Sequence, residues 1–292
     1  MRIIRARHLG MCFGVRDAIN LALTRADAGP LTILGDLVHN AEVLTTLRGR
    51  GVAVADDLSQ VQTQTVMVTA HGASERALAL TRARGLDVVE ATCPLVHVAH
   101  RAIKALVRDG YHPVIIGHRA HVEVRGLTGD LDAYDVVLNE ADVEALEGRP
   151  RMGVAAQTTQ PIDRVRALVT RIRQRFPASE VRFADTVCQP TKQRQTAAVD
   201  LARQCDVVIV IGGANSNNTR ELVETCRRHC LRVHHVHTAS DLLEEWFAAA
   251  GTVGLTAGTS TPDPVIDLVE GRVREFAAWR RDRESATLAG HR

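Results

Sequence analysis

The most constraining feature of this 292-residue sequence is a regular alternation of short apolar runs with longer amphipathic stretches. Short apolar runs are typical of buried strands, whereas apolar residues that recur at helical spacing are typical of helices. The run VVIVIGG at 207–213 is the clearest strand, because its apolar residues suit burial on both faces and its two glycines release the chain into a loop. Strand–helix alternation of this kind predicts an α/β fold with parallel sheets covered by helices.

The predicted elements cover most of the chain. We expect strands at 2–6, 31–34, 66–70, 113–117, 153–156, 207–211 and 253–256. We expect helices at 15–26, 74–84, 96–108, 162–176, 192–204, 218–229 and 264–281. The final residues, RDRESATLAGHR, lose apolar periodicity, so 282–292 is predicted to be a disordered tail.

The composition excludes several classes of protein. Apolar residues make up 45% and charged residues 24%, which is ordinary for a globular chain. Only 3% of residues are aromatic and the net charge is +2, which argues against a nucleic-acid partner. The amino-terminal MRIIRARHLGMCFGV lacks the features of a signal peptide, and no apolar run is long enough to predict a membrane span. Six cysteines in such a chain point to the reducing cytoplasm.

Three of the cysteines stand alone in separate short motifs, Cys12 in LGMCFGV, Cys93 in EATCPLV and Cys188 in TVCQPT. No CxxC pair occurs, so zinc-knuckle and thioredoxin-type motifs are absent. Similar lengths of chain separate the three, as expected if three similar structural units each donate one thiolate to a common centre. Three thiolates are one short of closing a tetrahedral zinc site or an iron–sulfur cluster, which would leave a position for substrate. The alternative is that each cysteine is a structural core residue.

The remaining three cysteines are Cys205, Cys226 and Cys230. We expect them to be buried, inert and structural, because free cysteine commonly behaves as a small hydrophobe. Cys226 and Cys230 lie four residues apart on one predicted helix, so a metal held between them is a weaker alternative.

Three histidines follow predicted strands: His39 in LVHN, His71 in TAHG and His121 in GHRAHVEV. Imidazoles at strand ends are placed to donate hydrogen bonds to an anion. In an extended segment His121 and Glu123 would share one face, and together they would form a proton-delivery pair. A surface ion pair is the alternative for these two residues.

Hydroxyl and amide side chains cluster in three further loops, within AAQTTQP, GGANSNNTREL and TAGTSTPD. Each loop precedes a predicted helix, and free N–H groups and hydroxyls at helix starts suit a phosphate group. Helix capping alone is the competing explanation. No Walker or GxGxxG motif occurs, so a nucleotide is not favoured. The candidate residues for a diphosphate pocket are Thr158, Thr159, Asn215, Ser216, Asn217, Asn218 and Ser260.

Nine short motifs occur in the order and at the approximate spacing of one family. They are MCFGV, LVHN, TAHG, ATCPLV, GHRAHVEV, QTT, the Cys188 segment, NSNN and TAGTSTP. Together they resemble the hydroxymethylbutenyl diphosphate reductase (LytB) family, from residue 1 to about residue 275. The resemblance implies three pseudo-equivalent α/β domains, each a small parallel sheet flanked by helices, in a trefoil-like arrangement around a central iron–sulfur cluster. The implied domains are 13–93, 94–186 and 1–12 with 187–281.

The resemblance also implies roles for individual residues. Cys12, Cys93 and Cys188 would hold a 4Fe–4S cluster whose fourth iron is open to the substrate hydroxyl. Glu123 would be the proton donor, assisted by His121, with Thr158 close to the substrate hydroxyl. The substrate would be bound by His39, His71, His121, Thr158, Thr159, Ser216, Asn217, Asn218 and Ser260.

The implied reaction is the reductive dehydroxylation of 4-hydroxy-3-methylbut-2-enyl diphosphate to isopentenyl and dimethylallyl diphosphate. This is the last step of the methylerythritol phosphate route to isoprenoids. A ferredoxin or flavodoxin is the implied electron donor, and the protein would act as a monomer or homodimer.

Three positions depart from the family's usual pattern. Asn217 replaces a serine in the NSNN loop, Gln193 replaces an asparagine after the third cysteine, and Glu221 replaces a basic residue. A divergent member that acts on another allylic diphosphate is therefore one alternative. Two others come from different classes: a non-enzymatic iron–sulfur sensor, and a zinc hydrolase with three thiolate ligands and Glu123 as base.

Overall fold

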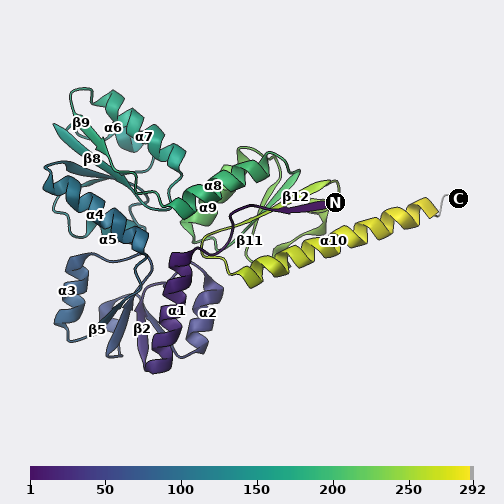
Figure 1. The fold of residues 1–292 in the computed structure, drawn as a ribbon, viewed down its shortest axis with the longest axis horizontal. Helices are drawn as coiled ribbons and strands as arrows, with labels where there is room; N and C mark the ends of the chain where they lie inside the picture. Colours follow the sequence, from purple (N-terminus) through teal and green to yellow (C-terminus); the bar gives the residue numbers. More distant parts are fainter. Residues whose placement is uncertain (290–292) are drawn as a thin grey trace. The chain divides into compact units, whose positions relative to one another are not determined.

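The computed structural model describes residues 1–289 and contains three four-stranded sheets whose paired strands all run parallel (Figure 1). Helices flank each sheet, so the predicted α/β class is confirmed. The chain divides into two compact units. Phe13–Thr191 contains two of the sheets, and Met1–Cys12 together with the chain from Lys192 onward contains the third.

The first sheet of the Phe13–Thr191 unit has the strand order β3-β2-β4-β5. Its central strands are apolar and buried, and Ile33 of β2 pairs in register with Met67 of β4. The elements are α1 (Phe13–Ala28), β2 (Leu31–Leu34), α2 (Ala41–Gly49), β3 (Ala53–Ala55), the short 3-10 helix η1 (Leu58–Gln60), β4 (Thr65–Val68), α3 (Glu75–Ala83) and β5 (Asp87–Glu90).

The second sheet of the same unit has the order β7-β6-β8-β9 and is covered on both faces. Alternate residues of β6 point to opposite sides: Val114 packs with Val165 of α7, whereas Ile115 packs with Ile103 of α4. The elements are α4 (Pro94–Arg108), β6 (His112–Ile116), α5 (Val122–Thr128), β7 (Asp135–Val137), α6 (Glu140–Glu144), β8 (Arg151–Ala156), α7 (Ile162–Arg175) and β9 (Glu180–Phe183).

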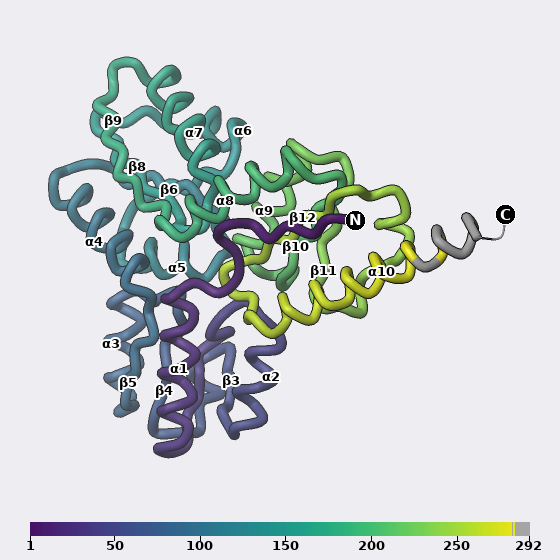
Figure 2. The backbone as a smooth tube through the Cα atoms, turned by 45° about the vertical axis from the view of Figure 1, so that its right-hand side comes forward, coloured from purple at the N-terminus to yellow at the C-terminus, as the bar shows by residue number. Residues whose placement is uncertain are grey.

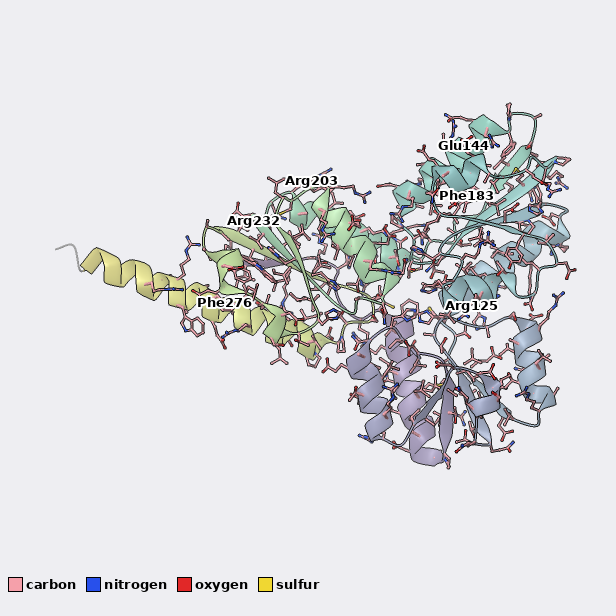
Figure 3. All side chains as sticks on the ribbon, turned by 180° about the vertical axis from the view of Figure 1, so that it is seen from behind. Arg125, Glu144, Phe183, Arg203, Arg232 and Phe276 are labelled. Atoms are coloured by element: carbon pink, nitrogen blue, oxygen red, sulfur yellow. The ribbon has the colours of Figure 1, made fainter. Side chains whose placement is uncertain are left out.

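The third sheet joins the two ends of the chain, because β1 pairs with β12 in the order β1-β12-β10-β11 (Figure 2). Ile209 of β10 shares a core cluster with Phe276 of α10 on one face, whereas Val208 shares another with Leu222 of α9 on the other. Figure 3 labels Phe276 on α10. The elements are β1 (Arg2–Arg5), α8 (Gln189–Ala202), β10 (Val207–Ile211), α9 (Asn217–Arg227), β11 (Val233–Val236), the 3-10 helices η2 (Ala239–Asp241) and η3 (Glu244–Phe247), β12 (Thr252–Ala257) and α10 (Asp263–Ala289).

All three sheets share one topology. In each, the strand that comes first is flanked by the second and the third, and the fourth lies beyond the third: β3-β2-β4-β5, β7-β6-β8-β9 and β11-β10-β12-β1. In the third sheet the amino-terminal β1 takes the place of the fourth strand. The three similar units expected from the cysteine spacing are therefore visible as three equivalent sheets.

The predicted elements differ from the structure in two ways. The seven predicted strands correspond to β1, β2, β4, β6, β8, β10 and β12, but β3, β5, β7, β9 and β11 were not predicted, nor were α2, α5 and α6. The expectation of disorder from residue 282 was also wrong as far as 289, because α10 continues to Ala289; residues 290–292 lie outside the described part. No helix among residues 1–289 has the length and apolar character needed to cross a bilayer.

Candidate functional site

Cys12, Cys93 and Cys188 occupy equivalent positions in the three sheets. Each follows the fourth strand of its sheet, and each comes directly before a helix: α1, α4 and α8 respectively. The backbone N–H of each cysteine donates to a carbonyl in the loop after the third strand of the same sheet. The donor–acceptor pairs, each 3.0 Å apart, are Cys12–Thr259, Cys93–Ala70 and Cys188–Thr158. An equivalent backbone hydrogen bond thus holds each of the three cysteines at the carboxyl edge of its sheet.

The surroundings of these thiols fit metal or cluster ligation. All three cysteines are half-buried rather than packed into the core. A Cβ at position 14 would overlap the Cys93 sulfur, so only glycine at that position leaves room for the thiol. Cys188 Sγ lies 3.1 Å from the Thr191 hydroxyl. Thiolates are soft donors that suit iron–sulfur clusters or zinc, and hydrogen bonds to sulfur tune such centres.

The structure brings His39, His71 and His121 together within the Phe13–Thr191 unit. Ring nitrogens of the three lie within 4.8 Å of one another, and the ring centroids are 4.3, 5.1 and 5.4 Å apart. The loops that follow β2, β4 and β6 supply one histidine each. Burial lowers the pKa of His71 well below its usual value, and the neighbouring His39 and His121 lower it further. His71 is therefore a neutral imidazole near pH 7.

A backbone hydrogen bond selects the tautomer of His121. The Glu123 N–H donates to His121 Nδ1 at 3.1 Å, and His121 is thereby the N-cap of α5. Because Nδ1 accepts, the proton of the neutral ring is on Nε2, which makes Nε2 the donor atom of this imidazole. The expectation of an extended segment here was wrong, since the imidazole cap starts a helix at Val122 and Glu123 lies in its first turn.

Glu123 is the most strongly perturbed carboxyl group in this region. It is 1% exposed, and its two oxygens accept from Thr158, Oε1 from the backbone N–H at 2.6 Å and Oε2 from the hydroxyl at 3.0 Å. Burial raises the pKa of Glu123 to about 7, although the two hydrogen bonds from Thr158 act in the opposite direction. A carboxyl group with this pKa can hold and release a proton near neutral pH.

Gln157 and Gln160 support this site and were not singled out from the sequence. Both are fully buried. Gln157 Oε1 accepts from the His118 N–H at 3.1 Å and from Gln160 Nε2 at 3.2 Å, and Gln157 Nε2 donates to the Thr159 hydroxyl at 3.1 Å. Gln157 therefore ties the loop after β6 to the loop after β8. The available signal was a glutamine that directly follows an apolar strand, as polar residues rarely remain buried there without a partner.

The hydroxyl and amide candidates of the other unit lie in the loops after β10 and β12. Ser216 is the N-cap of α9 and accepts from the Thr219 N–H at 3.3 Å. Asn217 and Asn218 occupy the first turn of α9, and both are 2% exposed. Ser260 is 4% exposed in the loop between β12 and α10. Asn218 Nδ2 is shielded from solvent and makes no hydrogen bond within residues 1–289, so it is a donor that an anion would satisfy.

Thr219 positions the start of α9 and was also missed in the sequence. It is fully buried, and its hydroxyl occupies the space where a Cβ at Gly212 or at Gly258 would lie. Gly212 follows β10 and Gly258 follows β12, so the absence of two side chains lets α9 approach the carboxyl edge of the sheet. Two glycines at the ends of neighbouring strands were the sequence signal.

The three positions that depart from the family pattern differ in environment. Asn217 and Glu221 are buried on α9, with Glu221 only 6% exposed, whereas Gln193 is exposed on α8. The buried positions therefore change the interior around α9, and Gln193 changes a surface.

Cys226 and Cys230 are buried, as expected of structural cysteines, whereas Cys205 is only partly buried. The expectation that Cys226 and Cys230 share one helix was wrong, because α9 ends at Arg227. Burial raises the pKa of Cys205 to about 11 and that of Cys226 to about 12, and Cys230 Sγ lies 3.4 Å from the Cys205 carbonyl. Within residues 1–289, only His39, His71 and His121 form a converging group of three or more potential metal ligands. A metal held by Cys226 and Cys230 would thus have no third ligand from the described chain.

The fold and these residues define a class of protein: a parallel α/β chain of three equivalent sheets, with thiols and imidazoles in the loops that follow the strands and a buried carboxyl group at the start of a helix. A family model described as LytB protein matches residues 3–274. The chain therefore belongs to the LytB family.

Named relatives match along nearly their whole length. The 4-hydroxy-3-methylbut-2-enyl diphosphate reductase of Pelobacter propionicus is 38% identical over 278 residues, covering 94% of this chain and 99% of that protein. The protein of the same name from Geobacter sp. strain M21 is 39% identical over 276 residues, covering 94% and 97%. A solved structure of the E-1-hydroxy-2-methyl-but-2-enyl-4-diphosphate reductase from Plasmodium falciparum has a TM-score of 0.85 at 27% identity, covering 91% of this chain and 86% of that one.

Proposed function

We propose that this chain is a 4-hydroxy-3-methylbut-2-enyl diphosphate reductase that forms isopentenyl and dimethylallyl diphosphate. Relatives of that name cover nearly all of the chain, and the sequence resemblance points to the same reaction. The observation that carries the proposal is the buried Glu123–Thr158 pair, because the reaction consumes protons at a site shielded from water. The motif departures at Asn217 and Glu221 leave this pair and the three cysteines intact.

The reaction balances with two electrons and two protons. The C–O bond of the allylic alcohol breaks, one proton leaves with the hydroxyl oxygen as water, and the other is added to one end of the allyl unit. Addition at one end gives isopentenyl diphosphate, and addition at the other gives dimethylallyl diphosphate. The residues of the chain must therefore bind the diphosphate, exclude water and deliver protons.

We assign Cys12, Cys93 and Cys188 as ligands of a 4Fe–4S cluster. Their equivalent positions after the fourth strands, and the glycine that makes room for the Cys93 sulfur, support this assignment. When bound, such a cluster supplies electrons one at a time and an open iron that acts as a Lewis acid on the hydroxyl group. A ferredoxin or flavodoxin would reduce it, in the cytoplasm.

We assign diphosphate binding to seven residues of the strand-end loops and of the first turn of α9: His39, His71, His121, Ser216, Asn217, Asn218 and Ser260. His121 Nε2–H is preset as a donor by the hydrogen bond that its Nδ1 accepts. Neutral donors of this kind bind an anion through hydrogen bonds without requiring a buried cation. Thr159, whose hydroxyl accepts from Gln157, would complete the loop beside the substrate.

Glu123 is assigned as the proton donor and Thr158 as the residue that orients it. At a pKa of about 7 the carboxyl group is partly protonated at neutral pH, and the Thr158 N–H holds one of its oxygens in place. The Thr158 hydroxyl is the polar group through which a proton can pass between Glu123 and a substrate hydroxyl. His121 adjoins this pair because it accepts from the Glu123 N–H.

The decisive test is turnover of 4-hydroxy-3-methylbut-2-enyl diphosphate by anaerobically reconstituted protein with a strong reductant. We expect isopentenyl and dimethylallyl diphosphate as products, with iron and acid-labile sulfide present. Protein that contains zinc but no acid-labile sulfide would instead favour the zinc hydrolase. A cluster whose spectrum does not respond to the diphosphate would favour a sensor.

A further inference from the structure

Arg194 of α8 holds the loop that precedes Cys12. Its Nε and Nη2 both donate to the carbonyl oxygen of Gly10, at 3.0 and 2.8 Å. The side chain is 7% exposed, so the two hydrogen bonds form away from solvent. Two bonds from one rigid guanidinium that converge on one carbonyl oxygen hold that oxygen more firmly than a single donor would.

The backbone of this loop also makes hydrogen bonds to the loop after β12. The Gly10 N–H donates to the Ala257 carbonyl at 3.1 Å, and the Cys12 N–H donates to the Thr259 carbonyl at 3.0 Å. Gly10 has a φ of +73°, and a Cβ there would lie 2.7 Å from Ile266 Cδ1, so a side chain at this turn is excluded. Arg194 is therefore the side chain that holds the carbonyl side of the turn two residues before Cys12.

The other two cysteines are supported by their own helices. The Cys93 carbonyl accepts from the Val96 and His97 N–H groups at 2.9 and 3.2 Å, at the start of α4. Cys188 lies 3.1 Å from the hydroxyl of Thr191, in the first turn of α8. The Cys12 segment instead depends on a side chain that is remote in sequence.

We propose that Arg194 is a positioning residue for Cys12, which fixes the Gly10 peptide and thereby presents the Cys12 thiolate to a cluster. The inference rests on the proposed function in that it takes Cys12 as a ligand. Lysine at this position would keep the positive charge but lacks the planar group from which two N–H donors converge on one carbonyl oxygen. The substitution Arg194→Lys therefore removes the geometry and leaves the charge.

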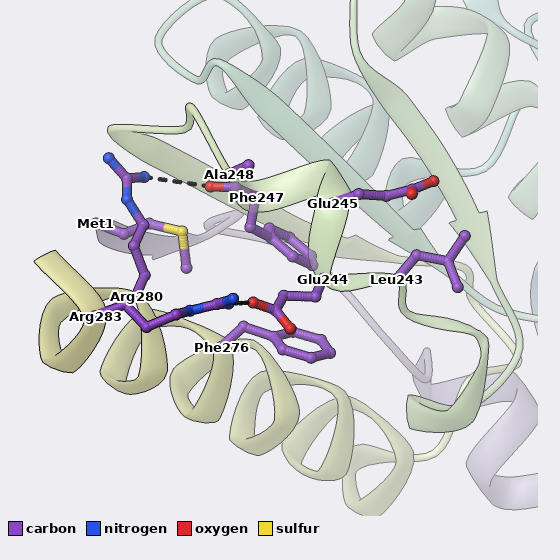
Figure 4. Close-up of a pocket in the computed structure, with 9 residues that line it drawn as sticks. All are labelled: Met1, Leu243, Glu244, Glu245, Phe247, Ala248, Phe276, Arg280 and Arg283. Carbon is purple, nitrogen blue, oxygen red and sulfur yellow. Dashed lines mark hydrogen bonds and ion pairs between the residues drawn. The ribbon is translucent and has the colours of Figure 1, made fainter. Parts of the chain in front are cut away.

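Arg280 provides a matched control in the same unit. Its Nη1 donates to the Phe247 and Ala250 carbonyls at 3.2 and 2.7 Å, beside a cavity of about 580 Å³ that η3 and α10 line (Figure 4). The substitution Arg280→Lys thus disturbs an arginine–carbonyl contact that is not part of the Cys12 loop. An effect that both variants share is the effect of replacing any carbonyl-bound arginine by lysine, and it is not specific to the Cys12 loop.

The first measurement needs no cluster. Apoprotein is treated anaerobically with iodoacetamide, and alkylation of each cysteine is followed by peptide mass spectrometry. We expect Cys12 to react about fivefold faster in Arg194→Lys, because its loop opens more often, with Cys93 and Cys188 unchanged. Arg280→Lys should leave all three rates at the wild-type value. An unchanged Cys12 rate, or an equal increase at all three cysteines, would overturn the proposal.

The second measurement uses reconstituted protein and follows iron loss to a chelator. Groups that orient metal ligands commonly change metal affinity by 10- to 100-fold, so we expect loss about tenfold faster in Arg194→Lys than in Arg280→Lys. Equal rates would contradict the role of Arg194. If wild-type protein takes up no iron and sulfide, the proposed function is wrong. The Cys12 alkylation rate would still show whether Arg194 positions the Cys12 loop. Arg194→Gln, which retains one donor group, is measured in parallel in case Arg194→Lys does not fold.

Discussion

Thr158 donates two hydrogen bonds to Glu123, one from its backbone N–H at 2.6 Å and one from its hydroxyl at 3.0 Å. Both bonds favour the ionised carboxylate, yet burial outweighs them and raises the pKa of Glu123 to about 7. The pair therefore balances two opposed effects at the pH where the protein would work. The pH dependence of both activity and stability should reveal that balance.

The activity of the reductase should fall as pH rises above about 7. Glu123 must be protonated to deliver a proton, so kcat should decrease about tenfold per pH unit on the alkaline side. Thr158→Val removes the hydroxyl bond that favours the ionised form, so this alkaline limb should move to higher pH. Single-turnover rates measured from pH 6 to 9 on both proteins check this. An alkaline limb that did not move in Thr158→Val would contradict the coupling.

Replacing Glu123 by Gln should nearly abolish turnover and at the same time stabilise the apoprotein at high pH. A carboxyl group whose pKa is raised on folding from 4.5 to about 7 destabilises the folded state increasingly between those two pH values. The penalty is about 3 kcal/mol above pH 7 and vanishes below about pH 4.5. Urea unfolding at pH 5 and pH 8 should therefore show a variant that gains stability relative to wild type mainly at pH 8. Equal gains at both pH values would point to packing instead of ionisation.

The strands that the sequence revealed are mainly the central ones. Residues of β10 and β6 are buried on both faces of their sheets. Each fully buried aliphatic side chain stabilises the fold by about 1.5–3 kcal/mol. Apolar residues are therefore favoured at consecutive positions of these strands, and the sequence shows them as an unbroken apolar run. Edge strands such as β5, with the sequence DVVE, and β9, with EVRF, are half exposed and short. Their register depends on hydrogen bonds to a neighbouring strand, which no local pattern encodes.

The residues of the candidate site also divide into those that local sequence patterns predicted and those that they did not. Cysteines, histidines and hydroxyls at strand ends could be singled out because parallel sheets place ligands there. The N-cap formed by His121 could not be predicted, because histidine is not among the residues preferred at an N-cap. For this reason the sequence did not predict α5. Gln157, Thr219 and Arg194 were missed for a related reason. Each acts through a contact with a loop that is distant in sequence, so only the folded chain shows its partner.

A methyl group at Gly14 should displace the Cys93 thiol. Both Gly14 and Gly271 lie in helices, but a Cβ at position 14 overlaps the Cys93 sulfur, whereas a Cβ at position 271 meets nothing within 4 Å. Gly271→Ala should therefore stabilise the protein by about 0.5–1 kcal/mol through helix propensity. Gly14→Ala should destabilise it by about 1–3 kcal/mol and lower the iron content after reconstitution. Thermal unfolding and iron analysis of the two variants, side by side, provide the measurement, and similar behaviour would refute the overlap.

The close packing of Thr219 against Gly258 predicts a rescue. A Cβ at position 258 overlaps the Thr219 hydroxyl, so Gly258→Ala should cost about 1–3 kcal/mol and push the start of α9 away from the sheet. Because Asn217 and Asn218 lie in that first turn, KM for the diphosphate should rise while cluster content is retained.

Thr219→Ala removes the overlapping atom at little cost, since the Thr219 hydroxyl makes no hydrogen bond within the described chain. The double variant should therefore regain part of both the lost stability and the lost affinity, which gives a favourable coupling free energy in a double-mutant cycle. Thr219 Cβ would still lie 3.2 Å from the new methyl group, so we expect the rescue to be partial. Strictly additive effects of the two substitutions would show that the two positions do not compete for one space, and that α9 is held near the sheet by other contacts.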